Sequence, residues 1–221
     1  MATKNFQETR DCLKSFLSPH YSKKSIVLDA GCGYRNHLIN KAEVQELVGV
    51  DINSDAIREN QDISCGIKVN LEELGAIDFG QKFDLVMSYD VMEHIEAPEK
   101  FIYAVSKILQ PRGKFFFITP NKLSILGFLT SALPINWLIY LSIAISGRKT
   151  TNEVHFYRMN QVNTIVRCLH ANKFDKTHIV LLDCLPSNKW LRKCSYADYL
   201  IGRCGLVRNY SSKLVCMAIL S

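Results

Sequence analysis

Apolar residues in the first half of the chain fall into short, nearly continuous runs that are bounded by turn residues and separated by segments with helical spacing. Strands covered by helices on both faces have such runs, because neither face meets water. Their alternation with helical segments is typical of βαβ units around a parallel sheet. The five predicted strands are SIVLDAG (25–31), ELVGVDI (46–52), GIKVNL (66–71), FDLVMSY (83–89) and GKFFFITP (113–120).

Helical spacing of apolar residues predicts three helices. They are expected at 54–61 with Asn53 or Ser54 as the N-cap, at 98–110 before Pro111 and Gly113, and at 160–172. A further short helix is expected to begin at Asp90. Two late apolar runs, 178–185 and 212–220, predict two more strands, which gives seven in all.

Residues 123–146 contain no charged side chain, and their length would span a bilayer. A single span would place strands of one sheet on opposite sides of a membrane, which the fold forbids. Pro134 instead predicts two short helices folded back as a hairpin. This hairpin is expected either to be a lid packed on the domain or to contact a membrane or a lipophilic ligand, and the flanking Arg148 and Lys149 favour the membrane.

Composition places the chain among folded globular proteins, with 48% hydrophobic and 22% charged residues in 221. The eight cysteines form no C-x-x-C pair and follow a polar N-terminus, so we expect reduced thiols, no zinc site and a cytoplasmic protein. The net charge of +6 does not by itself decide between partners. The sequence does not indicate an oligomeric state.

The segment VLDAGCGYR (27–35) places Asp29, Gly31 and Gly33 where the first strand should turn toward a helix. Glycines allow the backbone to pass close to a ligand and its N–H groups to point at it. About twenty residues later, Asp51 ends the second strand, where a carboxylate can accept hydrogen bonds from both hydroxyls of a ribose. Each feature alone could be a simple turn or cap, but their order and spacing favour a nucleoside-containing cofactor.

Five successive segments between residues 25 and 121, namely LDAGCG, GVDIN, VNLEEL, FDLVMSYDVMEHI and LQPRGKFFFITPN, resemble the motifs of class I S-adenosylmethionine-dependent methyltransferases. The resemblance implies that S-adenosylmethionine is the cofactor. It implies that the methionine end is lined by Asp29, Gly31, Cys32 and Gly33, the ribose held by Asp51, and the adenine contacted by Ile52 and Asn70, with Tyr89 beside the cofactor. Arg35 departs from the family, which usually has a glycine there, and this puts the geometry of Tyr34–Asn36 in doubt.

The length of the chain predicts a single domain over 1–221. The resemblance also implies a Rossmann-like sheet of seven strands. The sheet is expected to be mostly parallel, with its last strand antiparallel, and to be flanked by helices. We expect a cofactor-binding half at 20–121, a hydrophobic helical insertion at 122–152 after the fifth strand, and a substrate-side half at 153–221.

Asp90, Glu93 and His94 would share one face of a helix and could hold a proton, a substrate hydroxyl or a divalent ion. Asp90 and Glu93 also have the spacing of a capping box, so they could simply begin the helix. This segment is similar to that of ubiquinone-pathway O-methyltransferases, some of which place a metal nearby, but we assign no metal ligand here. His94, Glu93 and His155, in EVHFYRMN, are the candidate catalytic residues.

The expected reaction is methyl transfer to a small, lipophilic acceptor, most readily at oxygen. A dehydrogenase is disfavoured because its G-x-G-x-x-G fingerprint would need a glycine at Asn36. Nucleic-acid base methylation is disfavoured because SYDV follows the fourth strand in place of an N-P-P-Y motif. A catalytically inactive binding subunit and an RNA or protein methyltransferase remain the alternatives.

Overall fold

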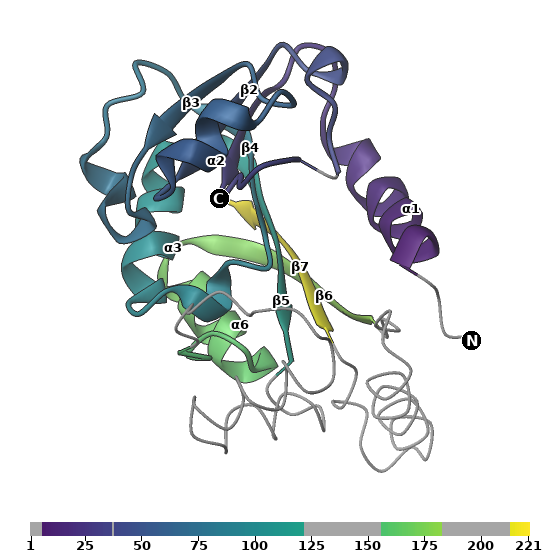
Figure 1. The fold of residues 1–221 in the computed structure, drawn as a ribbon. Helices are drawn as coiled ribbons and strands as arrows, with labels where there is room; N and C mark the ends of the chain where they lie inside the picture. The colour runs from purple at the N-terminus through teal and green to yellow at the C-terminus, as the bar shows by residue number, and fades with distance from the viewer. Residues whose placement is uncertain (1–5, 37, 122–155, 183–212) are drawn as a thin grey trace, which may run out of the picture.

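The computed structural model describes residues 6–36, 38–121, 156–182 and 213–221, which form a sheet of seven strands with helices on both faces (Figure 1). The strands lie in the order β3-β2-β1-β4-β5-β7-β6. Neighbouring strands from β3 to β5 are parallel, and β7 is antiparallel to both β5 and β6. The predicted fold, with its antiparallel last strand, is therefore confirmed.

All seven predicted strands are present, with small shifts at their ends. Their bounds are β1 (Ile26–Ala30), β2 (Glu46–Asp51), β3 (Cys65–Lys68), β4 (Phe83–Tyr89), β5 (Leu109–Pro120), β6 (Phe174–Leu182) and β7 (Lys213–Leu220). The α-helices among the described residues are α1 (Phe6–Leu17), α2 (Ser54–Glu59), α3 (Pro98–Ile108) and α6 (Val162–Ala171), and short 3-10 turns lie at Ser18–His20, Lys41–Glu43, Leu71–Ala76 and Met92–His94.

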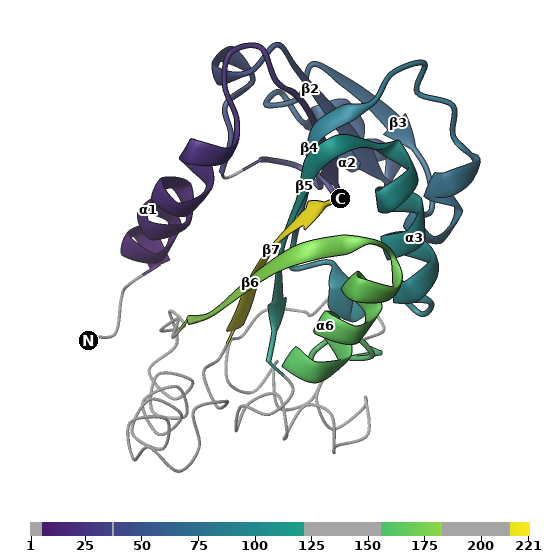
Figure 2. The ribbon, with the colours of Figure 1, turned by 180° about the vertical axis from the view of Figure 1, so that it is seen from behind.

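The two faces of the sheet carry separate apolar cores, because alternate residues of each strand point to opposite sides. On β5, Phe115 and Phe117 pack toward α3 and α6, whereas Phe116 and Ile118 pack toward α1. Figures 1 and 2 show these helices on opposite sides of the sheet. The inner strands of the sheet are therefore buried on both faces, as their unbroken apolar runs predicted. The edge strands β3 and β6 are mostly exposed or half-buried, so for β3 the predicted burial on both faces was wrong.

The helix α1 was not predicted. Its sequence is polar overall, and the apolar positions Leu13 and Leu17 that it buries are too few to produce a clear pattern. The helix at 54–61 is confirmed with Asn53 as its cap, since the Asn53 side chain accepts hydrogen bonds from the N–H groups of Asp55 and Ala56.

The prediction of a helix that begins at Asp90 was wrong. Only a short 3-10 turn forms, at Met92–His94, and it has no side-chain cap. Asp90 lies outside it with φ of 54°, so the residue forms no capping box with Glu93. Asp90, Glu93 and His94 therefore do not share one face of an α-helix.

The predicted insertion at 122–152, its uncharged segment 123–146 and the candidate His155 lie outside the described residues. Within the part of the chain that the structure describes, no helix is both long and apolar enough to cross a membrane. The division of a single domain into the halves 20–121 and 153–221 stays a prediction.

Candidate functional site

The glycine loop after β1 lies at the carboxyl end of the sheet, against the end of β2. The N–H groups of Gly31 and Cys32 both donate to the carbonyl of Val50, at 2.8 and 3.1 Å. Gly31 and Gly33 have left-handed φ values of 83° and 51°, a conformation that glycine adopts without steric cost. Glycine therefore suits the loop conformation at both positions, and at Gly31 it is also required for space, because an added Cβ would lie 2.4 Å from a methyl carbon of Val91.

Asp51 holds this loop at the end of β2. Its carboxylate accepts hydrogen bonds from the N–H of Gly33 at 2.9 Å and from the N–H of Asn53 at 2.8 Å, one on each oxygen. Each carboxylate oxygen can accept more than one hydrogen bond. Asp51 can therefore orient the loop and still accept hydrogen bonds from a ligand.

Two asparagines that were not predicted complete the loop. Asn60, which is buried, donates to the carbonyls of Cys32 at 3.1 Å and Gly33 at 3.0 Å. Asn36 donates to the carboxylate of Asp29 at 2.8 Å, while its own side-chain oxygen accepts from the N–H groups of Leu38 and Ile39. Their only signal in the sequence is a short amide side chain near a turn, which is too common to indicate a site.

Asp29 and Cys32 are both buried beneath the loop. Burial raises the pKa of Asp29 to about 7, with a contribution from the negative charge of Asp51 and against the stabilising hydrogen bond from Asn36. Burial also raises the pKa of the Cys32 thiol to about 12, so Cys32 is a packed thiol rather than a nucleophile.

Arg35 does not disturb the loop backbone. The described non-glycine residues with a left-handed φ are Asp90, Arg112, Tyr157 and Lys173, and Arg35 is not among them. Its exposed side chain lines the edge of the cavity beside the loop. A glycine is therefore not required at this position, and the doubt that the sequence raised about Tyr34–Asn36 is removed.

Two cavities flank the glycine loop and meet at Gly31. The first, which we call the loop cavity, has a volume of about 400 Å³. Its lining consists of Asp29, Gly31, Cys32, Gly33, Tyr34, Arg35, Asn36, Leu38, Met87 and Tyr89. The second, the strand-end cavity, has a volume of about 530 Å³. Its lining consists of Gly31, Asp51, Ile52, Val69, Asn70, Leu71, Glu72, Asp90, Val91, His94, Ile95 and Phe156.

Every cofactor-binding residue predicted from the sequence lines one of these cavities. Asp29, Cys32, Gly33 and Tyr89 line the loop cavity, Asp51, Ile52 and Asn70 line the strand-end cavity, and Gly31 lines both. Ile52 leaves 66% of its surface exposed, an unusual position for a large apolar residue. Asn70 also caps the Leu71–Ala76 turn by accepting from the N–H of Glu72.

Of the candidate catalytic residues, the described ones have different surroundings. His94 lines the strand-end cavity with Asp51 and Asn70. Glu93 is buried, and the hydroxyl of Thr119 donates to its carboxyl group at 3.3 Å. Among the described residues, no group of three or more His, Cys, Asp or Glu side chains could hold a metal ion.

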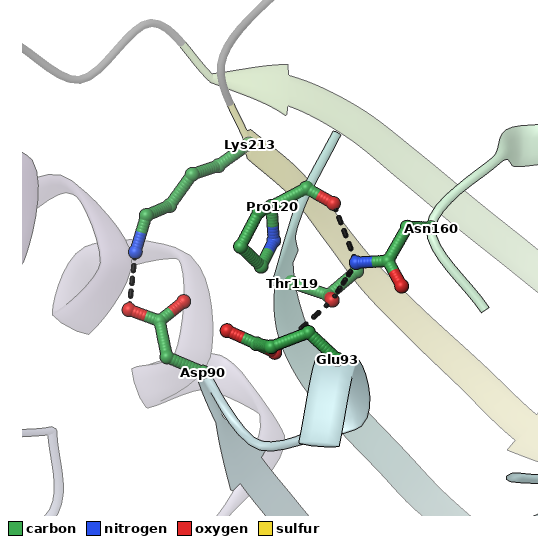
Figure 3. A network of polar contacts seen from close by, with 6 residues as sticks. All are labelled: Asp90, Glu93, Thr119, Pro120, Asn160 and Lys213. Carbon is green, nitrogen blue, oxygen red and sulfur yellow. Dashed lines mark hydrogen bonds and ion pairs between the residues drawn. The ribbon is translucent and has the colours of Figure 1, made fainter. Parts of the chain in front are cut away.

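A buried polar assembly surrounds Glu93 at the carboxyl ends of β4 and β5 and the amino end of β7 (Figure 3). The amide of Asn160 donates to the Thr119 hydroxyl at 2.6 Å and to the carbonyl of Pro120 at 2.7 Å. Lys213, the first residue of β7, forms an ion pair with Asp90. Burial, followed by the negative charge of Asp90, raises the pKa of Glu93 to about 8, so Glu93 holds its proton at neutral pH.

Comparison with known proteins supports one family. The model of a protein family described as a methyltransferase domain matches residues 1–192. A ubiquinone biosynthesis O-methyltransferase from Bartonella bacilliformis is 30% identical over 105 residues, which cover 43% of this chain and 41% of that protein. The chain thus spans less than half the length of the curated relatives it matches.

Solved structures have the same fold at low sequence identity. A S-adenosylmethionine-dependent methyltransferase from Archaeoglobus fulgidus superposes with a TM-score of 0.60 at 19% identity, covering 97% of this chain and 96% of that one. Magnesium protoporphyrin IX methyltransferase from Synechocystis, solved with bound S-adenosylhomocysteine, gives 0.58 at 18% identity, covering 100% and 90%. At these identities the likeness establishes the fold.

Proposed function

This chain belongs to the methyltransferase domain family, and we propose that it transfers the methyl group of S-adenosylmethionine to an oxygen of a small, lipophilic acceptor. The class predicted from the sequence, an S-adenosylmethionine-dependent methyltransferase, is confirmed at the level of the family. The acceptor, the acceptor atom and the roles of single residues belong to the proposal.

The observation that carries the proposal is the pair of cavities that meet at Gly31. A side chain at Gly33 would meet no atom within 4 Å, so its missing Cβ faces open space where a ligand can approach the backbone closely. The loop cavity suits the methionine part of the cofactor, and the strand-end cavity suits its ribose and adenine. A ligand across Gly31 would occupy both.

In this arrangement Asp51 accepts hydrogen bonds from the ribose hydroxyls, and Asn70 faces the adenine edge. Ile52 supplies an apolar surface for the adenine ring, which explains why so exposed a side chain is apolar. Covering a large apolar side chain is worth roughly 1.5 to 3 kcal/mol. Tyr89 lies beside the methionine part, in the loop cavity.

The cofactor supplies an electrophilic methyl group on a sulfonium. The chain's own contribution is to hold the acceptor oxygen in line with that group and to exclude water, which can be worth an effective molarity of about 10⁵ M or more. His94 is the only described member of the predicted catalytic set whose side chain lines a cavity, and we assign it the proton of the acceptor hydroxyl. His155 remains a candidate on its sequence position alone.

An oxygen acceptor with an apolar body is supported by the similar proteins. The curated relatives described above are named ubiquinone biosynthesis O-methyltransferases. A phenolic ring with a hydrocarbon tail therefore fits the proposal better than a strongly charged acceptor.

The test is S-adenosylhomocysteine release from S-adenosylmethionine in the presence of single acceptors. We expect turnover with a prenylated phenol and none with bulk RNA, a histone mixture or buffer, and we expect Asp51→Ala to need much more cofactor for half-maximal rate. Turnover with RNA or protein only would overturn the acceptor class. Cofactor binding without turnover on any acceptor would instead support an inactive binding subunit.

Contact with a membrane surface through residues 123–146, in a cytoplasmic protein, is the remaining part of the proposal, and it rests on the uncharged sequence between Lys122 and Arg148. Anionic lipid should favour such contact, because each basic residue near the surface contributes about 1 kcal/mol. Liposome co-sedimentation tests it. Binding that requires anionic lipid and is lost in Trp137→Glu with Leu138→Glu supports the contact, and indifference to liposomes contradicts it.

A further inference from the structure

Lys213 begins β7 and reaches across the end of β5 to the segment that follows β4. Its backbone pairs with Pro120 of β5, while its ammonium pairs with the carboxylate of Asp90 (Figure 3). The ammonium also lies 5.2 Å from the centre of the Tyr89 ring. The side chains of Lys213 and Asp90 are 22% and 33% exposed, so water only partly screens the pair. The Lys213 ammonium thus contacts Tyr89 and Asp90, two consecutive residues of the site, although Lys213 lies 123 residues after Asp90 in the sequence.

Asp90 is held in a conformation that it would not adopt alone. Its φ of 54° is left-handed, and such strain persists only when the surroundings determine it. The N–H of Asp90 donates to the carbonyl of Ile118 at 3.0 Å, which fixes its backbone on one side. One carboxylate oxygen pairs with Lys213, and the other is buried without a hydrogen-bond partner among the described residues. Lys213 is therefore the partner that balances this carboxylate.

The segment that Lys213 fixes forms part of both cavities. Tyr89 lines the loop cavity, whereas Asp90 and Val91 line the strand-end cavity. Val91 also packs directly on Gly31, because a Cβ added to Gly31 would lie 2.4 Å from a methyl carbon of Val91. A shift of Asp90 would move Val91 and Tyr89 with it, and both cavities would change at the point where they meet.

We propose that Lys213 is a positioning residue for the cofactor, which acts through Asp90 by fixing the Tyr89–Val91 segment against the Gly31 backbone. The inference rests on the proposed function, since it assumes that the cofactor lies across Gly31. In this proposal β7 contributes a residue to the cofactor site, in addition to pairing with β5 and β6 in the sheet. An ion pair that only stabilised the fold would change stability and leave the affinity of the folded protein unaltered.

The experiment is calorimetric titration of S-adenosylhomocysteine into Lys213→Met, Lys213→Arg and Lys176→Met, at a temperature where circular dichroism shows each variant folded. Methionine keeps the length of the side chain without its charge, and Lys176→Met is the matched control at an exposed lysine of β6. We expect the Kd to rise about tenfold in Lys213→Met and to stay within threefold of the native value in the other two. A native Kd in Lys213→Met, whatever its melting temperature, overturns the proposal.

A double-mutant cycle tests whether Lys213 acts through Asp90. Asparagine tolerates a left-handed φ, so Asp90→Asn removes the charge and keeps the backbone. We expect Asp90→Asn combined with Lys213→Met to bind no more weakly than either single variant, whereas multiplied losses would contradict the stated route. If the native protein does not bind S-adenosylhomocysteine, the proposed function itself fails. Native binding with an unaffected Lys213→Met overturns only the role of Lys213.

Discussion

The two walls of the site are built in different ways. The wall at β1 and β2 consists of the glycine loop and Asp51. The hydrogen bond that joins them links Gly33 to Asp51, which are 18 residues apart in the sequence. The wall at β4, β5 and β7 joins Asp90 to Lys213, which are 123 residues apart. The first wall depends on backbone conformation and short contacts, and the second on charges that only the completed sheet brings together. The first can therefore be recognised as a motif, whereas the second becomes visible only in the fold.

Gly31→Ala should have the largest effect, because Gly31 is where the two walls touch. A Cβ there meets Val91 at 2.4 Å on a backbone with φ of 83°. We expect cofactor binding to be lost and the free energy of unfolding to fall by roughly 3 kcal/mol or more, from left-handed strain and overpacking together. Calorimetry and urea unfolding measure the two effects.

Gly80→Ala is the matched control for this change. Gly80 has a φ of 65°, has no atom within 4 Å of an added Cβ, and lines neither of the two cavities. It should lose about 1 to 2 kcal/mol of stability and bind S-adenosylhomocysteine as the native chain does. Equal binding by both alanine variants would contradict the placement of the cofactor across Gly31.

His94→Ala tests whether the strand-end cavity extends to the acceptor. A group that takes a proton from the acceptor contributes to the rate, so we expect turnover to fall about a hundredfold with little change in S-adenosylhomocysteine affinity. The measurement is steady-state turnover of a prenylated phenol beside calorimetry. A loss of affinity with turnover preserved at saturation would make His94 a cofactor residue of the strand-end cavity.

Asp51→Ala should weaken cofactor binding by roughly ten- to a hundredfold, since hydrogen bonds to a charged acceptor contribute about 1.5 to 3 kcal/mol. The same change removes the carboxylate that accepts from the Gly33 N–H. We expect water to take the place of this acceptor, because Gly33 is half-buried. Asp51→Asn separates the two roles, because the amide oxygen can still accept one of these hydrogen bonds. An unchanged affinity in Asp51→Ala would remove the ribose role.

Glu93→Gln should have the smallest effect on cofactor binding, because it concerns the second wall alone. In the fold the pKa of Glu93 is about 8, against an ordinary value of 4.5. The folded protein therefore binds more protons between these pH values, and stability falls as the pH rises from 4.5 to about 8. Glutamine removes this contribution, so the loss of unfolding free energy between these limits should shrink, by at most about 5 kcal/mol for these two pKa values. An unchanged pH slope in urea unfolding would contradict the buried, protonated Glu93.

The sequence predicts features formed by residues that are close along the chain, and it misses those that depend on distant partners. The strands were predicted because burial on both faces leaves unbroken apolar runs, and the Asp29–Asp51 site because its parts follow one another along the chain. The prediction of a helix at Asp90 was wrong: Asp90 takes a left-handed φ, its carboxylate pairs with Lys213, and its side chain caps no helix. Local spacing contains no information about a partner on the last strand.

The start of β5 differs from its predicted position for a reason found in the chain nearby. The structure begins β5 at Leu109, four residues before the predicted start, because Leu109 already pairs with Phe83 of β4. The register then shifts to Leu85 and Lys114, and Arg112 takes a left-handed φ of 63° within this irregularity. A Cβ at Gly113 would lie 2.7 Å from the carbonyl oxygen of Gln110, so glycine accommodates this irregularity. In the sequence, Pro111 and Gly113 indicate a break between a helix and a strand.

The central claim is that the chain binds S-adenosylmethionine and its product across Gly31, and thermal unfolding with added ligands tests it most directly. We expect S-adenosylhomocysteine and S-adenosylmethionine each to stabilise the native chain, by about 2.7 kcal/mol at one hundred times the dissociation constant, and NAD to leave it unchanged. Stabilisation by NAD alone, or by none of the three in a folded protein, would contradict the account.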